Sequence, residues 1–306
     1  MKQLWVEKYR PKTVDDYVWR DDGQRKMIQN WIEEKSIPHL LLSGSPGIGK
    51  TSLARLLINE IGIEDQDLLE INASRERGLD LMKEKITNFV QILSFGAFKV
   101  VLLDEADRLT PFAQDALKGI MEEYSGFSRF ILTCNTPTMI VPALHSRCQQ
   151  IHFTKVDKTE FTARAATILV SENINFDLDL LDKYVEVAYP DLRKCINLLQ
   201  QNSTDGNLKE PNAEDTGIAE WKFDMIELFK AGKLREARKL LCGKLLADEM
   251  ITVYTWLYNN LEIFGDDDSQ DRALITIKQG LIDHTICADP EINLSATLAK
   301  LGRLSQ

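Results

Sequence analysis

A glycine-rich segment at residues 44–51 offers the clearest chemistry in the sequence. It reads Gly-Ser-Pro-Gly-Ile-Gly-Lys-Thr and matches G-x-x-x-x-G-K-[ST] between an apolar run and a helical pattern. Glycines here let consecutive backbone N–H groups turn toward a phosphate at a helix N-terminus. The lysine is expected to reach the β- and γ-phosphates of ATP, and the threonine hydroxyl to bind Mg²⁺. The predicted nucleotide-binding residues of this segment are Ser45, Pro46, Gly47, Ile48, Gly49, Lys50, Thr51 and Ser52.

Two acidic residues follow a second apolar run at residues 100–103. Asp104 is placed to hold Mg²⁺ through water, and Glu105 to orient and polarise the water that attacks the γ-phosphate. We expect this strand to lie beside the strand that leads into the glycine-rich segment. Asn135 ends the next apolar run and can hydrogen-bond the γ-phosphate or the attacking water; the alternative is that it only caps the turn that follows.

Residues 104–107 also spell Asp-Glu-Ala-Asp, the signature of one group of RNA helicases. Those helicases need a second nucleotide-gripping RecA-like domain. Since the pattern after Phe153 is purely helical, the helicase interpretation fails.

Five short apolar runs alternate with helical patterns in the first half of the chain. Near-continuous apolar runs of this length predict a buried parallel sheet with helices on both faces, an α/β fold. The predicted strands are residues 39–43, 68–72, 99–103, 129–133 and 150–153.

The strand pattern stops at Lys155, and the rest of the chain is helical in period. A polar, turn-rich segment at residues 202–217 interrupts it and is typical of a linker. The acidic run at residues 266–268 is expected to be a solvated loop. The predicted helices are residues 157–172, 177–188 and 191–202 before the linker, and 219–231, 233–246, 249–264, 268–284 and 289–302 after it.

Charge and composition restrict the classes of partner. The 306 residues carry 37 Lys+Arg and 47 Asp+Glu, a net charge of 37 − 47 = −10. The net charge is −2 for residues 1–153 and −8 for residues 154–306, so any DNA contact is expected to be local and to belong to the first half. No run approaches the ~18 apolar residues of a membrane span, and the start lacks a signal sequence. Five scattered cysteines give neither a disulfide framework nor a zinc module. We expect a cytoplasmic protein without a membrane partner.

Beyond these patterns, the chain resembles the clamp-loader ATPase subunits of the AAA+ superfamily, in particular the small subunits of replication factor C and the ATPase subunit of T-even-type phage clamp loaders. The matching segments run in the family's order from residue 5 to about residue 200. They are residues 5–12 (Trp-Val-Glu-Lys-Tyr-Arg-Pro-Lys), 38–41, 72–78 (Asn-Ala-Ser-Arg-Glu-Arg-Gly), 114–117, 146–148 (Ser-Arg-Cys) and 191–194.

The resemblance implies a domain organisation and roles for further residues. It implies an AAA+ P-loop ATPase domain at 1–153, an all-α lid at 154–204, a linker at 205–217 and an all-α collar for oligomerisation at 218–306. Arg147 matches the arginine finger supplied to the ATP site of the neighbouring subunit. Arg193 matches the lid sensor of the γ-phosphate in its own subunit; a plain ion pair is the alternative for both arginines. Gln114 matches the position that couples DNA contact to the catalytic glutamate. The residues that match the segment around the adenine are Tyr9, Arg10 and Pro11.

DNA contacts are also implied by the resemblance. In the family, helix N-termini that face the inside of a spiral follow the duplex backbone, a contact that reads no sequence. For residues 72–88 the alternative is a solvated helical face that does not contact DNA. Separately, we expect residues 120–124 to contact the clamp. The matching DNA-binding positions are Ser74, Arg75, Arg77, Gly78 and Thr110.

The predicted function is that of a sliding-clamp loader ATPase subunit with ATP and Mg²⁺ as cofactors. It would act in a ring or spiral of ATPase subunits with at least one different subunit, and open and close a sliding clamp on primer–template DNA. Alternatives are a branch-migration motor of the same superfamily and a non-hydrolysing structural subunit. The short chain and its acidic C-terminal half favour a phage over an archaeal source.

Overall fold

The chain divides into two compact units, Met1–Glu210 and Pro211–Gln306. The structure is a computed structural model that describes residues 3–75, 79–210, 228, 233–244 and 247–303. No helix within these ranges is both long and apolar enough to cross a membrane.

A five-stranded parallel sheet forms the centre of the first unit, in the order β2-β3-β4-β1-β5. Every residue of β1 is buried, as are all residues of β3 except the last, so the near-continuous apolar runs predicted the sheet correctly. The strands are β1 Leu40–Gly44, β2 Leu68–Asn72, β3 Lys99–Asp104, β4 Ser128–Cys134 and β5 Gln149–Phe153.

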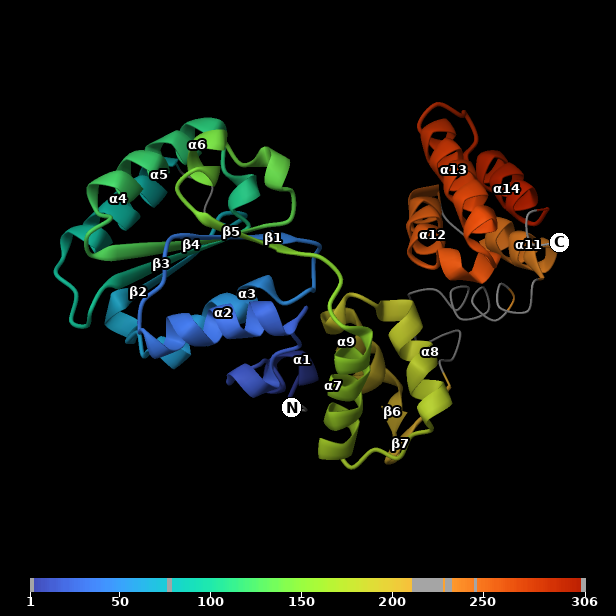
Figure 1. The fold of residues 1–306 in the computed structure, drawn as a ribbon, viewed down its shortest axis with the longest axis horizontal. Coiled ribbons are helices and arrows are strands. Elements are labelled where there is room, and N and C mark those ends of the chain that lie inside the picture. Colours follow the sequence, from blue (N-terminus) through green and yellow to red (C-terminus); the bar gives the residue numbers. More distant parts are fainter. Residues whose placement is uncertain (1–2, 76–78, 211–227, 229–232, 245–246, 304–306) are drawn as a thin grey trace. The chain divides into compact units, whose positions relative to one another are not determined.

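Helices cover both faces of this sheet, as the sequence predicted. In Figure 1, α2 and α3 lie on one face and α4, α5 and α6 on the other. The helices and short 3₁₀ segments up to β5 are α1 Trp5–Lys8, η1 Val14–Asp16, α2 Asp22–Glu33, α3 Lys50–Ile61, η2 Asp65–Asp67, α4 Leu79–Gln91, η3 Ala106–Arg108, α5 Pro111–Glu123, η4 Pro137–Met139 and α6 Pro142–His145.

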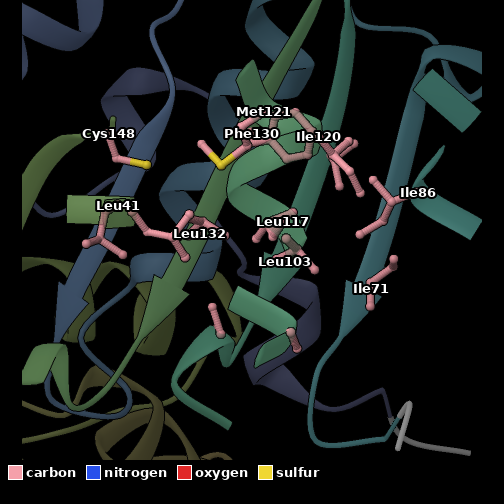
Figure 2. Close-up of a cluster of buried hydrophobic side chains, with 14 of the residues drawn as sticks. Leu41, Ile71, Ile86, Leu103, Leu117, Ile120, Met121, Phe130, Leu132 and Cys148 are labelled. Carbon is pink, nitrogen blue, oxygen red and sulfur yellow. The ribbon is translucent and has the colours of Figure 1, made fainter. Parts of the chain in front are cut away.

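The core between the sheet and α4–α6 is largely apolar. Leu103 and Leu132 from the strands meet Ile86 of α4 and Leu117 of α5, and all four side chains are fully buried (Figure 2). This packing fixes the carboxyl ends of the strands, where the predicted chemistry lies.

One expectation about the sheet was wrong. The strand that ends in Asp104, β3, does not neighbour β1, because β4 lies between them. The Asp104 carboxylate still reaches Thr51 at the start of α3, since the polar residues at the carboxyl ends of parallel strands share one edge of the sheet.

Three helices complete the first unit: α7 Lys158–Ser171, α8 Leu178–Ala188 and α9 Leu192–Asn202. The expectation that no strand follows Lys155 was wrong, because β6 Ser203–Thr204 and β7 Asn207–Leu208 form an antiparallel hairpin inside the expected linker. Asp205 and Gly206 form its turn with φ angles of 53° and 75°, the left-handed pair that a two-residue hairpin turn requires. Residues 211–217 of that linker lie outside the described residues.

The described part of the second unit is helical. Its elements are α11 Leu234–Lys244, α12 Ala247–Asn259, η5 Leu261–Phe264, α13 Asp267–His284 and α14 Pro290–Leu301. They enclose a core that includes Leu257, Ile277 and Leu298. The acidic run was predicted wrongly as a loop: Asp266 caps α13 through the Ser269 amide, and Asp267 and Asp268 form its first turn, where the helix dipole favours negative charge. The helix predicted at 219–231 lies almost wholly outside the described residues.

Candidate nucleotide site

A cleft in the first unit brings together most of the residues predicted to bind ATP. It lies between the carboxyl edge of the sheet, the N-terminal segment and helices α7 and α9. Ser45 is absent from the lining, but its carbonyl accepts a hydrogen bond from Lys50. The predicted residues that line the cleft are Tyr9, Arg10, Pro11, Pro46, Gly47, Ile48, Gly49, Lys50, Thr51, Ser52, Asp104, Glu105, Asn135 and Arg193.

The glycine-rich segment turns through left-handed backbone conformations. Gly47 has φ 74° and Gly49 has φ 100°, and Gly49 is the residue that precedes α3. A side chain at either position would be strained, and at Gly47 it would also meet the carboxylate of Asp191. The turn therefore ends at a helix N-terminus whose free N–H groups favour an anion.

Lys50 is buried at the mouth of this turn. Its ammonium donates hydrogen bonds to the carbonyls of Gly44 and Ser45, both at 2.7 Å, and to Asn135 Oδ1 at 2.9 Å. Burial lowers the pKa of Lys50, and the nearby carboxylates of Asp104 and Asp107 oppose that shift. The three acceptors hold the ammonium in a fixed place at the P-loop.

Thr51 and Asp104 bring together two oxygen atoms that could act as metal ligands. Thr51 Oγ1 donates to Asp104 Oδ1 at 2.8 Å, and Thr133 Oγ1 donates to the same oxygen at 2.5 Å. A hydroxyl and a carboxylate suit Mg²⁺, a hard cation that takes oxygen ligands and keeps much of its coordination for phosphates and water. Within the described ranges there is no group of three or more His, Cys, Asp or Glu residues that could hold a metal ion by themselves, so phosphate and water would have to supply the remaining ligands. The donor set therefore fits Mg²⁺ bound together with a nucleotide.

Glu105 sits in an unusual backbone conformation directly after β3. Its φ of 59° lies in the left-handed region, which non-glycine residues adopt rarely. Its N–H donates to Thr133 Oγ1 at 3.1 Å, and its carboxylate accepts a hydrogen bond from Ser74 Oγ. Thr133 of β4 thus holds the backbone of Glu105 at the edge of the cleft, and Ser74, two residues after β2, holds its side chain.

Asn135 follows β4, and its neighbour Asp107 positions it. Asp107 Oδ2 accepts hydrogen bonds from the backbone N–H groups of Asn135 and Thr136, at 3.1 and 3.0 Å. Beside it, burial raises the pKa of the Cys134 thiol to about 11, so this thiol stays protonated and uncharged near neutral pH. The Asn135 amide points at the lysine rather than capping the following turn.

The two predicted arginines lie in different places. Arg193, on α9, lines the cleft. Arg147, between α6 and β5, does not; it lies in a shallow depression with Trp31 and Arg129. Its guanidinium pairs with Glu122 and donates to the Ala143 carbonyl at 2.9 Å.

Gln114 is fully buried and joins two loops. Its Nε2 donates to the carbonyls of Leu109 and Met139 at 3.1 and 3.0 Å, and its Oε1 accepts from the Val141 N–H at 2.8 Å. These contacts tie the segment after Glu105 to the segment before Arg147.

The residues predicted to face DNA are only partly described. Ser74 and Arg75 are exposed after β2, while Arg77 and Gly78 lie outside the described residues. Thr110 Oγ1 accepts from the Ala113 N–H at 3.3 Å and so caps α5.

The segment expected to grip a clamp is exposed only at Glu122 and Glu123, and its contact with a clamp stays a prediction. Within 120–124, the apolar residues Ile120, Met121 and Tyr124 are buried in the sheet core and have no free surface to offer. Phe127, just beyond, and Leu93 and Phe95 in the loop after α4 are exposed instead. The Lys99 N–H donates to the Phe127 carbonyl, which places this loop end beside Phe127.

Several further residues of the cleft, most of them apolar, were not predicted from the sequence. Tyr17 and Val18 border it from the N-terminal side, and Phe161, Arg164 and Ile196 from α7 and α9. Tyr17 donates to the Gly49 carbonyl at 3.3 Å, and its burial raises the pKa of its hydroxyl. The only signal for these residues in the sequence was the helical period of residues 157–172 and 191–202, which predicts the helices but not that they border the cleft.

The fold and the site define a P-loop ATPase of the AAA class. The family model described as "ATPase family associated with various cellular activities (AAA)" matches residues 40–156. Along the whole chain, the replication factor C small subunit of Methanococcus vannielii is 36% identical over 99% of this chain and all of that protein. That of Sulfurisphaera tokodaii is 36% identical over 98% of this chain and 95% of that protein. The chain therefore belongs to the replication factor C small subunit family of clamp-loader AAA+ subunits, which confirms the resemblance seen in its motifs.

Solved structures support the fold at a greater distance. The match to the Thermotoga maritima RuvB Holliday junction branch migration motor has a TM-score of 0.57 at 16% sequence identity. It covers 72% of this chain and 79% of the RuvB chain. At this identity the likeness concerns the AAA+ fold alone.

Proposed function

We propose that this chain is an ATP-hydrolysing subunit of a sliding-clamp loader. It would work in a ring or spiral of like subunits with at least one different subunit, open a clamp when ATP binds, and release it on primer–template DNA after hydrolysis. Family membership supports this function, and the completeness of the ATP site carries it.

The cluster of Lys50, Thr51, Asp104, Glu105 and Asn135 supports active hydrolysis. In the proposed reaction the lysine and the P-loop N–H groups bind the β- and γ-phosphates, and Glu105 orients the attacking water. Thr51 and Asp104 would hold Mg²⁺, which neutralises charge on the phosphates. A non-hydrolysing subunit has no need of this set.

The separation of the two arginines supports an assembled active site. Arg193 lines the cleft of its own chain and is proposed to sense the γ-phosphate there. Arg147 lies outside that cleft, so it is proposed to complete the site of the next subunit as an arginine finger.

The hydrogen bonds of Gln114 and Ser74 support coupling to DNA. Ser74 is proposed to face the duplex with Arg75 and with Arg77, Gly78 and Thr110, and it holds the Glu105 carboxylate. Gln114 joins the segment after Glu105 to the loop before Arg147. A shift of these elements on DNA binding would release Glu105 for catalysis.

A branch-migration motor is the second candidate, because the RuvB likeness includes the AAA+ fold. Such motors usually append a winged-helix domain with a strand wing. The described residues of the second unit contain helices only. This observation favours the clamp loader.

The test is ATPase activity of the purified assembly, including its companion subunit, with four additions: none, single-stranded DNA, primer–template DNA, and primer–template DNA plus the cognate clamp. A clamp loader is stimulated most by the last. Equal stimulation by any single strand would favour a motor, and no ATPase in any condition would favour a structural subunit. The Glu105→Gln assembly is the matched control, since it should bind ATP without turnover.

A further inference from the structure

The N-terminal segment that carries Tyr9, Arg10 and Pro11 is fastened to the helices across the cleft. The Trp5 N–H donates to Gln200 Oε1 at 2.9 Å, and Gln200 Nε2 donates to the Gln3 carbonyl at 3.0 Å. Arg164 on α7 donates to the Tyr9 carbonyl at 3.1 Å. This segment is therefore attached to α7 and α9, while the P-loop belongs to the sheet.

Glu172 makes the contact that reaches the nucleotide cleft. It is the C-cap residue directly after α7, and its backbone N–H donates to the Ile168 carbonyl at 3.0 Å. Its carboxylate oxygen accepts from Lys8 Nζ at 2.7 Å and from the Tyr9 hydroxyl at 2.8 Å. The phenol is thus held at its outer end by a carboxylate that is itself fixed by a helix end.

The exposure of Lys8, Tyr9 and Glu172 distinguishes the Lys8–Glu172 ion pair from the Tyr9–Glu172 hydrogen bond. The Lys8 side chain is 42% exposed, and an ion pair this open contributes little. The Glu172 side chain is 19% exposed, and Tyr9 is one of the residues that line the cleft. Burial raises the pKa of the Glu172 carboxyl, but the bonds from Lys8 and Tyr9 lower it more, so the carboxylate is charged near neutral pH.

We propose that Glu172 is a positioning residue for adenine recognition: it accepts the Tyr9 hydrogen bond and thereby holds the Tyr9 ring against the base. Resting on the proposed nucleotide site, the inference adds a residue outside it. It also makes the N-terminal segment move with α7 and α9, so that the adenine is enclosed between a half carried by the sheet and a half carried by these helices.

The experiment compares ATP with inorganic tripolyphosphate, which offers the P-loop phosphates but no base. Binding of each to the purified full-length chain is measured by calorimetry for wild type, Glu172→Ala, Glu172→Gln and Tyr9→Phe. Glu172→Ala should weaken ATP binding about tenfold, the factor expected for one hydrogen bond to a charged group. Tripolyphosphate binding should stay unchanged. Glu172→Gln keeps an acceptor oxygen for the hydroxyl and should restore ATP affinity to within about twofold of wild type.

Three controls test the route through Tyr9. Tyr9→Phe should match Glu172→Ala, and the double variant should lose no more than either single one, because both remove the same bond. The exposed α8 variant Asp182→Ala should leave both affinities unchanged.

Several outcomes would overturn the inference. They are an unchanged ATP affinity in Glu172→Ala, an equal loss for ATP and tripolyphosphate, or a Glu172→Gln variant as weak as Glu172→Ala. If wild type binds ATP no more tightly than tripolyphosphate, the adenine site is wrong and the proposed function fails with it. The wild-type measurement thus separates the two failures.

Discussion

The Ser74 hydroxyl donates a hydrogen bond to the Glu105 carboxylate, across the neighbouring ends of β2 and β3. The residue expected to orient the attacking water is therefore held by a residue expected to face DNA. A second bond supports this arrangement, because the Ala73 N–H donates to the Asp104 carbonyl at 2.9 Å. Glu105 is constrained as long as Ser74 keeps its place.

Ser74→Ala should raise the ATPase rate without DNA about fivefold, the factor that corresponds to ~1 kcal/mol for one hydrogen bond. Because the constraint is already gone, stimulation by primer–template DNA should shrink. Steady-state ATPase of the assembly measures both, with the loop variant Ser94→Ala as the control. Equal basal and stimulated rates in Ser74→Ala and wild type would contradict the coupling.

Lys50→Ala and Glu105→Gln should fail in different ways. The first removes the ammonium from the phosphates and should weaken ATP binding at least about tenfold, as for the loss of a charged hydrogen bond. The second should leave binding nearly intact and slow turnover ~10²-fold or more, as for the loss of a general base. Equilibrium binding and single-turnover hydrolysis distinguish the two variants. An equal loss of ATP affinity in both would contradict the proposal that Glu105 orients the attacking water.

Arg147→Ala should bind ATP normally and be almost inactive, since an arginine finger contributes on the order of a thousandfold to turnover. Mixing Lys50→Ala with Arg147→Ala subunits in one assembly should restore DNA-stimulated activity. Random mixing of equal amounts rebuilds about a quarter of the head-to-tail interfaces between like subunits. An arginine acting within its own chain predicts no recovery at all, with subunit exchange verified separately.

Arg75→Ala should weaken binding of primer–template DNA similarly for all sequences, because a phosphate contact reads no base. The slope of log affinity against log salt should fall by about one. Fluorescence anisotropy at several salt concentrations measures this, with the exposed α2 variant Lys26→Ala as the control. A slope identical to that of wild type would show that Arg75 is a solvated surface residue that makes no phosphate contact.

Asp67 and Lys99 form a buried ion pair at 3.4 Å, with side chains 2% and 3% exposed. Asp67→Asn leaves the buried ammonium without its carboxylate and should cost about 3 kcal/mol of unfolding free energy at pH 7. Burial raises the pKa of Asp67. The N–H groups of Gly96 and Phe95 and the ammonium of Lys99 lower it by more, so the pKa in the folded protein is below its usual value.

Because the folded pKa of Asp67 is the lower one, its contribution is present above the unfolded value of about 4 and is lost as pH falls through the folded value. The stability difference between wild type and Asp67→Asn should therefore shrink below about pH 4. Urea unfolding at pH 7 and pH 3 tests this. The exposed neighbour Asp65→Asn should change stability little at either pH, and a constant difference for Asp67→Asn would contradict the ion pair.

The sequence predicted the sheet and the glycine-rich turn of the candidate site because both depend on local patterns. Strands buried on both faces give short apolar runs, and the P-loop places its lysine and threonine within one turn. The order of the strands depends on packing, which is why β3 was placed beside β1 although β4 separates them.

The remainder of the site depends on contacts between distant residues. No spacing in the sequence links Ser74 to Glu105, or Tyr9 to Glu172, because each pair meets only when two elements pack. The hairpin at Asp205 and Gly206 is a different case. Its turn signal was present, but the flanking strands are two residues each, too short for a periodic pattern.

The attachment of the N-terminus to α9 sets the order in which the chain can complete itself. Trp5 and its partner Gln200 are 195 residues apart in sequence. At ~5–20 residues per second, the ribosome releases the first residues about 10–40 s before their binding surface exists. Trp5, buried in the finished protein, must wait in that interval with its indole exposed. All five strands of the sheet precede Gln200 in the sequence and can pair earlier, so the side of the cleft formed by the N-terminal segment is completed after the sheet during synthesis.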